Sequence, residues 1–144
     1  MKNSLFAFLA AFGLLSLMGC PRPGGDCAVH FGAGESFSLD QGATACLTGA
    51  EAFSIRFDSV SGDSRCPVGV QCIWAGRVDA VFTLSQGKDT RTTVTLSSGD
   101  LGQGGKGETS LNGYTVKLEG VMPAKEEGKP IAQKDYKAKL RVSK

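Results

Sequence analysis

From about residue 35 onward, hydrophobic and polar residues alternate with a period of two along most of the chain. In AFSIRFD (52–58), the hydrophobic residues Phe53, Ile55 and Phe57 are separated by polar ones. Successive side chains of a strand point to opposite faces of a sheet, so this pattern predicts a strand with one buried face. The same period occurs in CIWAGRVDAVFTL (72–84), TRTTVTLS (90–97), GYTVKLE (113–119) and YKAKLRV (136–142), and more weakly in ESFSLD (35–40) and TACLTG (44–49).

Turn-forming residues separate these segments. They occur at Asp40 to Gly42, Gln86-Gly87, Asn112-Gly113 and the glycine-rich stretch Gly99 to Gly107, which we expect to be a hairpin loop. No segment past Cys20 has a helical period, and AKEEGKPIAQKD can form at most one turn. The pattern predicts an all-β fold: an antiparallel two-layer β-sandwich (Ig-like) or small barrel of six to seven strands, disulfide-stapled, over residues 27–144.

The N-terminus has the features of an export signal. Lys2 precedes an apolar run, LFAFLAAFGLLSLM, and small Gly19 precedes Cys20. The run is shorter than the ~20 residues of a spanning helix, so we expect residues 1–19 to be a signal peptide that is removed. An ordinary signal peptide with a nearby cysteine is the alternative.

The sequence LMGC (17–20) resembles the lipobox of bacterial lipoproteins. The resemblance implies that Cys20 is acylated, becomes the first residue of the mature protein and holds it to a membrane through lipid. Residues 20–26 are then the lipidated cysteine and a Pro/Gly-rich tether. In a Gram-negative host, Pro21 in place of an aspartate favours the cell outer membrane.

The other four cysteines are Cys27, Cys46, Cys66 and Cys72. Exported proteins fold where disulfides persist, and four cysteines allow three connectivities. We expect Cys27–Cys46 and Cys66–Cys72, because pairs close in sequence are joined most easily. A zinc site and a redox pair are the alternatives, but the C-x₅-C spacing suits neither.

The stretch DSRCPVGVQCIWAG (63–76) is similar to one in small uncharacterised bacterial secreted proteins and lipoproteins, and this resemblance implies no activity. From its residues we expect a disulfide-closed connection that leads into a central strand. Trp74, the chain's single tryptophan, is expected to fill the core beside Cys72. The alternative is that its ring stacks on a ligand.

Residues suited to catalysis are few. GQGGKG (102–107) has the G-x-G-x-x-G spacing of dinucleotide sites, but a strand rather than a helix is predicted after it. His30 is the only histidine and no catalytic motif accompanies it. We therefore expect no catalytic residue, no metal and no cofactor, with calcium at Asp58, Asp63 and Asp100 as a weaker alternative.

The C-terminal residues 125–144 carry seven Lys or Arg against three acidic residues. Three of these basic residues alternate with apolar residues in YKAKLRV, so we expect the solvated face of an edge strand. Contact with anionic lipid headgroups or lipopolysaccharide is the alternative. An exported protein is not expected to bind nucleic acid.

These observations favour a lipid-anchored, non-catalytic binding or accessory domain of the cell envelope, with an envelope protein or polymer as partner. A second hypothesis is an inhibitor of a secreted hydrolase, such as a protease or lysozyme. In that case the Cys66–Cys72 loop inserts Arg65 or Val68 into the enzyme's cleft. A third is a calcium-binding or structural envelope module.

Overall fold

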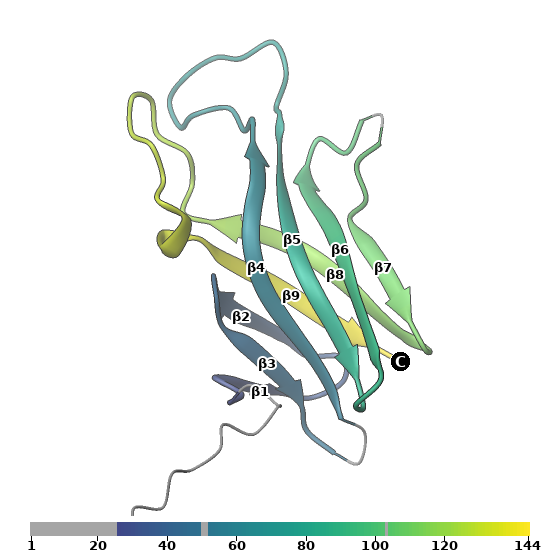
Figure 1. Cartoon of the computed structure of the whole chain (residues 1–144). Coiled ribbons are helices and arrows are strands. Elements are labelled where there is room, and N and C mark those ends of the chain that lie inside the picture. The colour runs from purple at the N-terminus through teal and green to yellow at the C-terminus, as the bar shows by residue number, and fades with distance from the viewer. Residues whose placement is uncertain (1–25, 50–51, 103) are drawn as a thin grey trace, which may run out of the picture.

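The computed structural model describes residues 26–49, 52–102 and 104–144 (Figure 1). In these residues the chain forms nine strands and one short 3₁₀ helix, η1 (Gln133–Asp135). The strands are β1 (Val29–Phe31), β2 (Ser36–Asp40), β3 (Thr44–Leu47), β4 (Phe53–Asp63), β5 (Arg77–Gln86), β6 (Thr90–Gly99), β7 (Glu108–Leu111), β8 (Tyr114–Met122) and β9 (Lys137–Ser143). The predicted all-β class is confirmed.

The strands form two sheets that pack face to face, which confirms the sandwich over the barrel (Figure 1). One sheet has the order β1-β3-β4-β5-β6 and the other the order β2-β9-β8-β7. Neighbouring strands are antiparallel except β1 and β3, which are parallel, contrary to the prediction. The reason is that β2 crosses to the other sheet and pairs with β9. The chain therefore returns to β3 in the direction that it had in β1.

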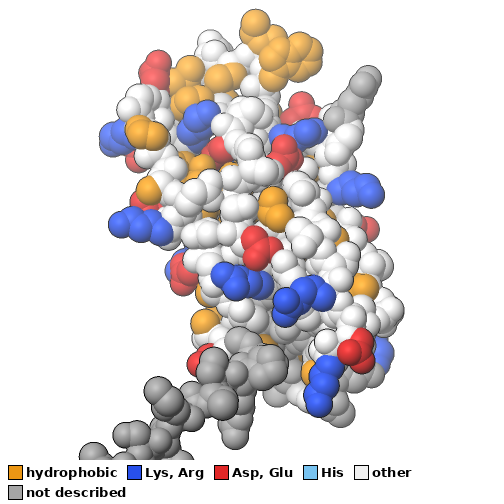
Figure 2. All heavy atoms as spheres, viewed as in Figure 1, with side chains coloured by type: hydrophobic (Ala, Val, Ile, Leu, Met, Phe, Trp, Pro, Cys, Tyr) orange, Lys and Arg blue, Asp and Glu red, His pale blue; other side chains and the backbone are white. Residues whose placement is uncertain are grey.

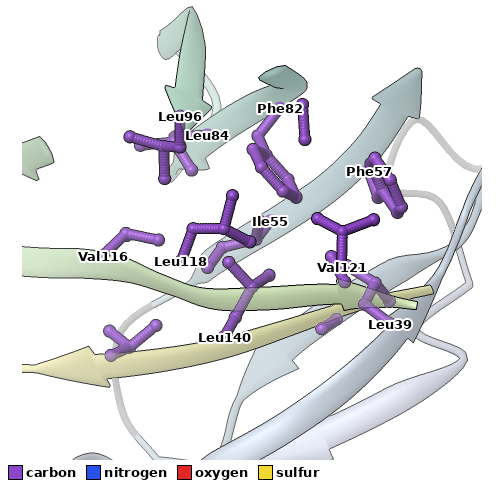
Figure 3. Packing of buried hydrophobic residues seen from close by; sticks show 14 of the residues in the cluster. Leu39, Ile55, Phe57, Phe82, Leu84, Leu96, Val116, Leu118, Val121 and Leu140 are labelled. Atoms are coloured by element: carbon purple, nitrogen blue, oxygen red, sulfur yellow. The ribbon is translucent and has the colours of Figure 1, made fainter. Parts of the chain in front are cut away.

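The core is formed by the residues of each strand that alternate inward. Figure 3 shows Ile55, Phe57 and Phe82 of one sheet facing Val116, Leu118 and Leu140 of the other. The Phe57 and Phe82 rings are stacked with their centroids 5.1 Å apart. Burial of such side chains contributes about 1.5–3 kcal/mol each, so the alternating pattern supplies the main stabilisation of the fold.

The structure has more strands than the six or seven predicted. β1 is only three residues long and has no clear alternation of its own. β7 and β8 form a hairpin around Asn112-Gly113, where both residues have positive φ (48° and 85°), as the predicted turn requires.

The prediction of a hairpin loop at Gly99 to Gly107 was wrong. β6 pairs with β5, whereas β7 pairs with β8 in the other sheet, so this segment crosses between the two layers. Hydrogen bonds from Ser97 N to Lys106 O (2.6 Å) and from Leu118 N to Gly107 O (2.9 Å) fix the crossover to both sheets.

The prediction that YKAKLRV is an edge strand was also wrong, because β9 lies between β2 and β8. Its basic residues do lie on the solvent face, as predicted. Lys137 pairs with Asp40 at 3.1 Å, and Lys139 and Arg141 pair with Glu119 at 3.6 and 3.0 Å. The basic run is thus largely balanced by neighbouring carboxylates. No helix within the three described ranges is long and apolar enough to cross a bilayer.

Candidate functional site

Both predicted disulfides are present, and they lie at opposite ends of the sandwich. Cys46 of β3 is the register partner of Ser54, near the start of β4, and is bonded to Cys27. Cys66 is bonded to Cys72 in the connection that follows the end of β4 at Asp63. The part of β4 between Ser54 and Asp63 is about 30 Å long. We call residues 64–76, the connection between β4 and β5, the tip; it is the upper teal loop in Figure 1.

The base of the tip continues the pairing of β4 with β5. Ser64 N donates to Arg77 O (2.8 Å) and Cys66 N donates to Ala75 O (2.9 Å). Gly76 has a φ of 68°, and a Cβ there would overlap the Ser64 carbonyl oxygen. Only glycine permits this close approach of the two backbones. The disulfide therefore closes a loop whose two ends are already held together.

An ion pair beneath the tip fixes it to the rest of the domain. Arg65 donates from Nε and Nη2 to the two carboxylate oxygens of Asp63 at 2.8 and 2.6 Å, and from Nη1 to Val121 O at 2.6 Å. The Tyr136 hydroxyl donates to Asp63 Oδ2 at 3.1 Å. Bidentate pairs of this kind have a defined geometry, so the base of the tip is rigid.

The charges in this network shift each other's pKa values. Burial raises the pKa of the Asp63 carboxyl, but the hydrogen bonds and charge of Arg65, with the Tyr136 hydroxyl, lower it to below its ordinary value. The hydrogen bond to Asp63 raises the pKa of Arg65. Burial, followed by the charge of Asp63, raises the pKa of Tyr136. The pair is therefore ionised at neutral pH.

The tip is also attached to the segment that connects β8 to β9. Val68 N donates to Lys125 O at 2.9 Å, and Lys125 Nζ donates to Asp63 O at 3.1 Å. The tip thus has contacts with its own strands through its base and with a second loop near its middle. These contacts leave little freedom to the backbone around the disulfide.

Large apolar side chains on the tip are exposed to solvent. Ile73 is 92% exposed, Trp74 76% and Val68 67%; we call these three residues the apolar crest. Figure 2 shows hydrophobic side chains gathered at this end of the molecule. The prediction that Trp74 fills the core was wrong. β5 begins at Arg77, so the alternation of the strand does not extend back to Trp74, and residues 73 and 74 bend away from the sheet.

The remaining residues singled out from the sequence lie in different surroundings. The Arg65 side chain is only 17% exposed and is held by Asp63, so it is not presented for insertion into an enzyme cleft. Val68 is presented on the crest. His30 is exposed on β1, at the opposite end of the sandwich from the tip. Cys20, the predicted lipidation site, lies outside the described residues.

The three predicted calcium ligands do not form one site: Asp63 and Asp100 border the same shallow groove beside the tip, but Asp58 does not. The carboxylate of Asp58 accepts from Thr83 Oγ1, that of Asp63 from Arg65, and that of Asp100 from Gly102 N. Among the described residues, no group of three or more His, Cys, Asp or Glu side chains is arranged to hold a metal ion. The calcium hypothesis therefore has no support from the geometry.

Ile73, the most exposed residue of the crest, was not identified from the sequence. A usable signal was the adjacent pair Ile73-Trp74, because two consecutive large apolar residues cannot both face the core from one strand. Such a pair beside a disulfide-bonded cysteine indicates a turn with at least one exposed apolar side chain.

Comparisons with protein-family models, with curated proteins and with solved structures find no match to this chain. The function is therefore inferred from the residues themselves.

Proposed function

We propose that this chain is a lipid-tethered, non-catalytic protein of the cell envelope that binds a partner protein through the apolar crest. The observation that carries the proposal is the exposure of Ile73 and Trp74 on a braced, disulfide-closed loop. Clustered apolar side chains at the surface of a soluble domain mark interaction sites.

The crest has the properties of a protein-binding surface. Tryptophan is enriched among the residues that dominate binding energy in protein interfaces. The tip is held by the disulfide, by the Arg65–Asp63 pair and by Val68 N to Lys125 O, so binding does not have to order it. A protruding, rigid, apolar loop suits a concave site on a partner.

The proposed lipid anchor favours a protein partner over the anchoring bilayer. The six residues between Cys20 and Cys27 can span at most about 25 Å. Cys27 lies at the end of the sandwich opposite the tip, which is more than about 30 Å away along β4. When the long axis of the sandwich is perpendicular to the membrane, the crest therefore points away from the leaflet that holds the lipid anchor. We propose the outer membrane as the location in a Gram-negative host, because Pro21 takes the place of the aspartate associated with inner-membrane retention.

Site-specific photo-crosslinking in the native host tests the crest. A benzophenone amino acid at position 73 is expected to yield one defined adduct, and Trp74→Ser in the same chain is expected to abolish that adduct. The matched control carries the same group at position 88, which is exposed in the turn between β5 and β6 at the other end of the sandwich. Identical adducts from both positions would contradict the proposal.

The anchor needs its own test. Replacement of Cys20 by serine is expected to move the protein from the membrane fraction to the soluble fraction, and mass spectrometry of the wild type is expected to find acyl chains on Cys20. A wild-type protein that starts at Met1 would disprove the anchor and leave the crest proposal standing.

Inhibition of a secreted hydrolase is the second candidate, favoured by the exposure of Val68 within the disulfide-closed loop. Inhibitory loops bind tightly because they are fixed in the bound conformation beforehand. In this form of the proposal Val68 enters the enzyme's cleft and Arg65 supports the loop from beneath. Unchanged rates of a panel of proteases and lysozymes at micromolar protein would exclude it.

A further inference from the structure

A groove of about 500 Å³ opens beside the tip, bordered by Trp74. Its walls come from the end of β4, the tip, the start of β5 and the crossover after β6. The volume of the groove is in the range of pockets that bind small molecules, about 300–1,000 Å³, but the groove is shallow and open to solvent. Its shape suits a side chain presented by another protein rather than an enclosed small molecule.

The charges that line the groove favour a cation. Three carboxylates line it, those of Asp63, Asp79 and Asp100, against the single guanidinium of Arg77. Asp63 is paired with Arg65, which belongs to the base of the tip. Asp79 pairs with Arg77 at 3.1 Å and accepts from Ser97 Oγ at 2.6 Å. These two carboxylates are therefore partly neutralised and fixed in place.

Asp100 differs from the other two carboxylates. It is exposed at the start of the crossover, and its Oδ1 accepts from Gly102 N at 3.1 Å. Within the described part of the chain, no cationic side chain forms an ion pair with Asp100. Its negative charge is thus available to a ligand in the groove.

A glycine keeps the groove open beside one of its carboxylates. Gly62 and Gly76 both line the groove. A Cβ at Gly62 would lie 3.7 Å from Asp79 Oδ2 and would narrow the approach to that carboxylate. A planar guanidinium can stack on an indole ring and donate to a carboxylate at the same time, which the compact ammonium of lysine does less well.

We infer that this groove receives an arginine side chain of the partner protein, with the guanidinium stacked on Trp74 and donating to Asp100. The inference rests on the proposed function and adds to it the chemistry of the partner. The partner's binding surface would combine a concave apolar site for Ile73 with a neighbouring arginine.

The single tryptophan makes this inference testable without the partner. Trp74 emission is followed while the processed protein is titrated with N-acetyl-arginine amide or with N-acetyl-citrulline amide, its uncharged isostere, at constant ionic strength. The arginine compound is expected to give a saturable change with a Kd on the order of 1–10 mM, and the citrulline compound only a linear, collisional one.

Two variants assign the effect to the groove. Asp100→Asn is expected to weaken arginine binding about two- to fivefold. Asp89→Asn, in the exposed turn at the other end of the sandwich, is expected to leave binding unchanged. Equal binding of citrulline and arginine, or equal effects of the two variants, would overturn the inference. Because no partner is needed, this result is independent of the crosslinking at position 73.

Discussion

The two disulfides are chemically alike but serve different regions of the molecule. Their Cα atoms are 5.7 Å apart in Cys27–Cys46 and 5.9 Å apart in Cys66–Cys72. The first joins Cys27, near the start of the described residues, to Cys46 of β3, which follows the buried Ala45 in the chain. The second closes a loop that carries the exposed Val68. The exposed Ile73 and Trp74 come directly after this loop. One bond ties the segment before β1 to β3, and the other closes a loop at the surface.

The difference follows from what each bond encloses. β1 is a three-residue strand at the edge of its sheet, too short to be held by backbone pairing alone, and the disulfide keeps it against β3. The tip is already closed by backbone hydrogen bonds and by Arg65, so its disulfide mainly limits the motion of the crest. A disulfide in an otherwise well-held loop thus indicates that the loop's shape has a use.

The largest effect is expected from removal of the first bond. Cys27→Ser combined with Cys46→Ser is expected to lower the free energy of unfolding by about 3 kcal/mol, because the closed loop is the longer one. Urea unfolding measures the change. The exposure of Trp74 to solvent quenchers should stay the same, and a change in it would show that the two ends are not independent.

Removal of the ion pair under the tip comes next. Arg65→Ala removes the guanidinium from the Val121 carbonyl and from a largely buried Asp63 carboxylate, which keeps only the Tyr136 hydroxyl and a backbone N–H as donors, so we expect a loss of about 2–3 kcal/mol in the free energy of unfolding. The control is Arg56→Ala. The Arg56 side chain, which pairs with Asp58, is 57% exposed, so this substitution is expected to lower the free energy of unfolding by less than about 1 kcal/mol. Equal losses in the two variants would contradict the bracing role of Arg65.

Removal of the second bond is expected to cost about 2 kcal/mol, less than removal of the first, since Cys66 and Cys72 close a short loop. Cys66→Ser combined with Cys72→Ser should instead have its main effect on the crest. The adduct from position 73 is expected to become weaker or to be lost while the core remains folded. An unchanged adduct would show that the disulfide is not needed to shape the crest.

Acid is expected to weaken the tip before the core. Because the native pKa of Asp63 lies below its ordinary value of about 3.9, the pair contributes its full stability above that pH. The contribution falls as the pH falls through the native pKa. The difference in unfolding free energy between wild type and Asp63→Asn should therefore shrink below about pH 4. A difference that is constant with pH would exclude this linkage.

Much of the fold could be predicted because strand alternation is a local property. The segments around Phe57, Val94, Val116 and Leu140 were all placed in strands, and the turn at Asn112-Gly113 was placed correctly. The disulfide pairing was also predicted correctly, since both bonds join cysteines that are close in sequence.

Errors arose where non-local contacts decide the outcome. The position of β9 inside its sheet depends on pairing with β2, about a hundred residues earlier, and no local pattern reports it. Likewise the crossover between β6 and β7 has the composition of a hairpin loop. Trp74 was placed in the core because its spacing from Val78 suits a strand, whereas the strand begins only at Arg77.

Collisional quenching of the Trp74 fluorescence shows whether the crest is rigid and exposed to solvent. Because the chain has a single tryptophan, the signal reports on this residue alone. We expect neutral quenchers to reach Trp74 in the folded protein nearly as well as in the unfolded chain, while the anisotropy of Trp74 remains that of the whole domain. Emission that is shielded from quenchers until the protein unfolds would place Trp74 in the core and rule out an exposed crest.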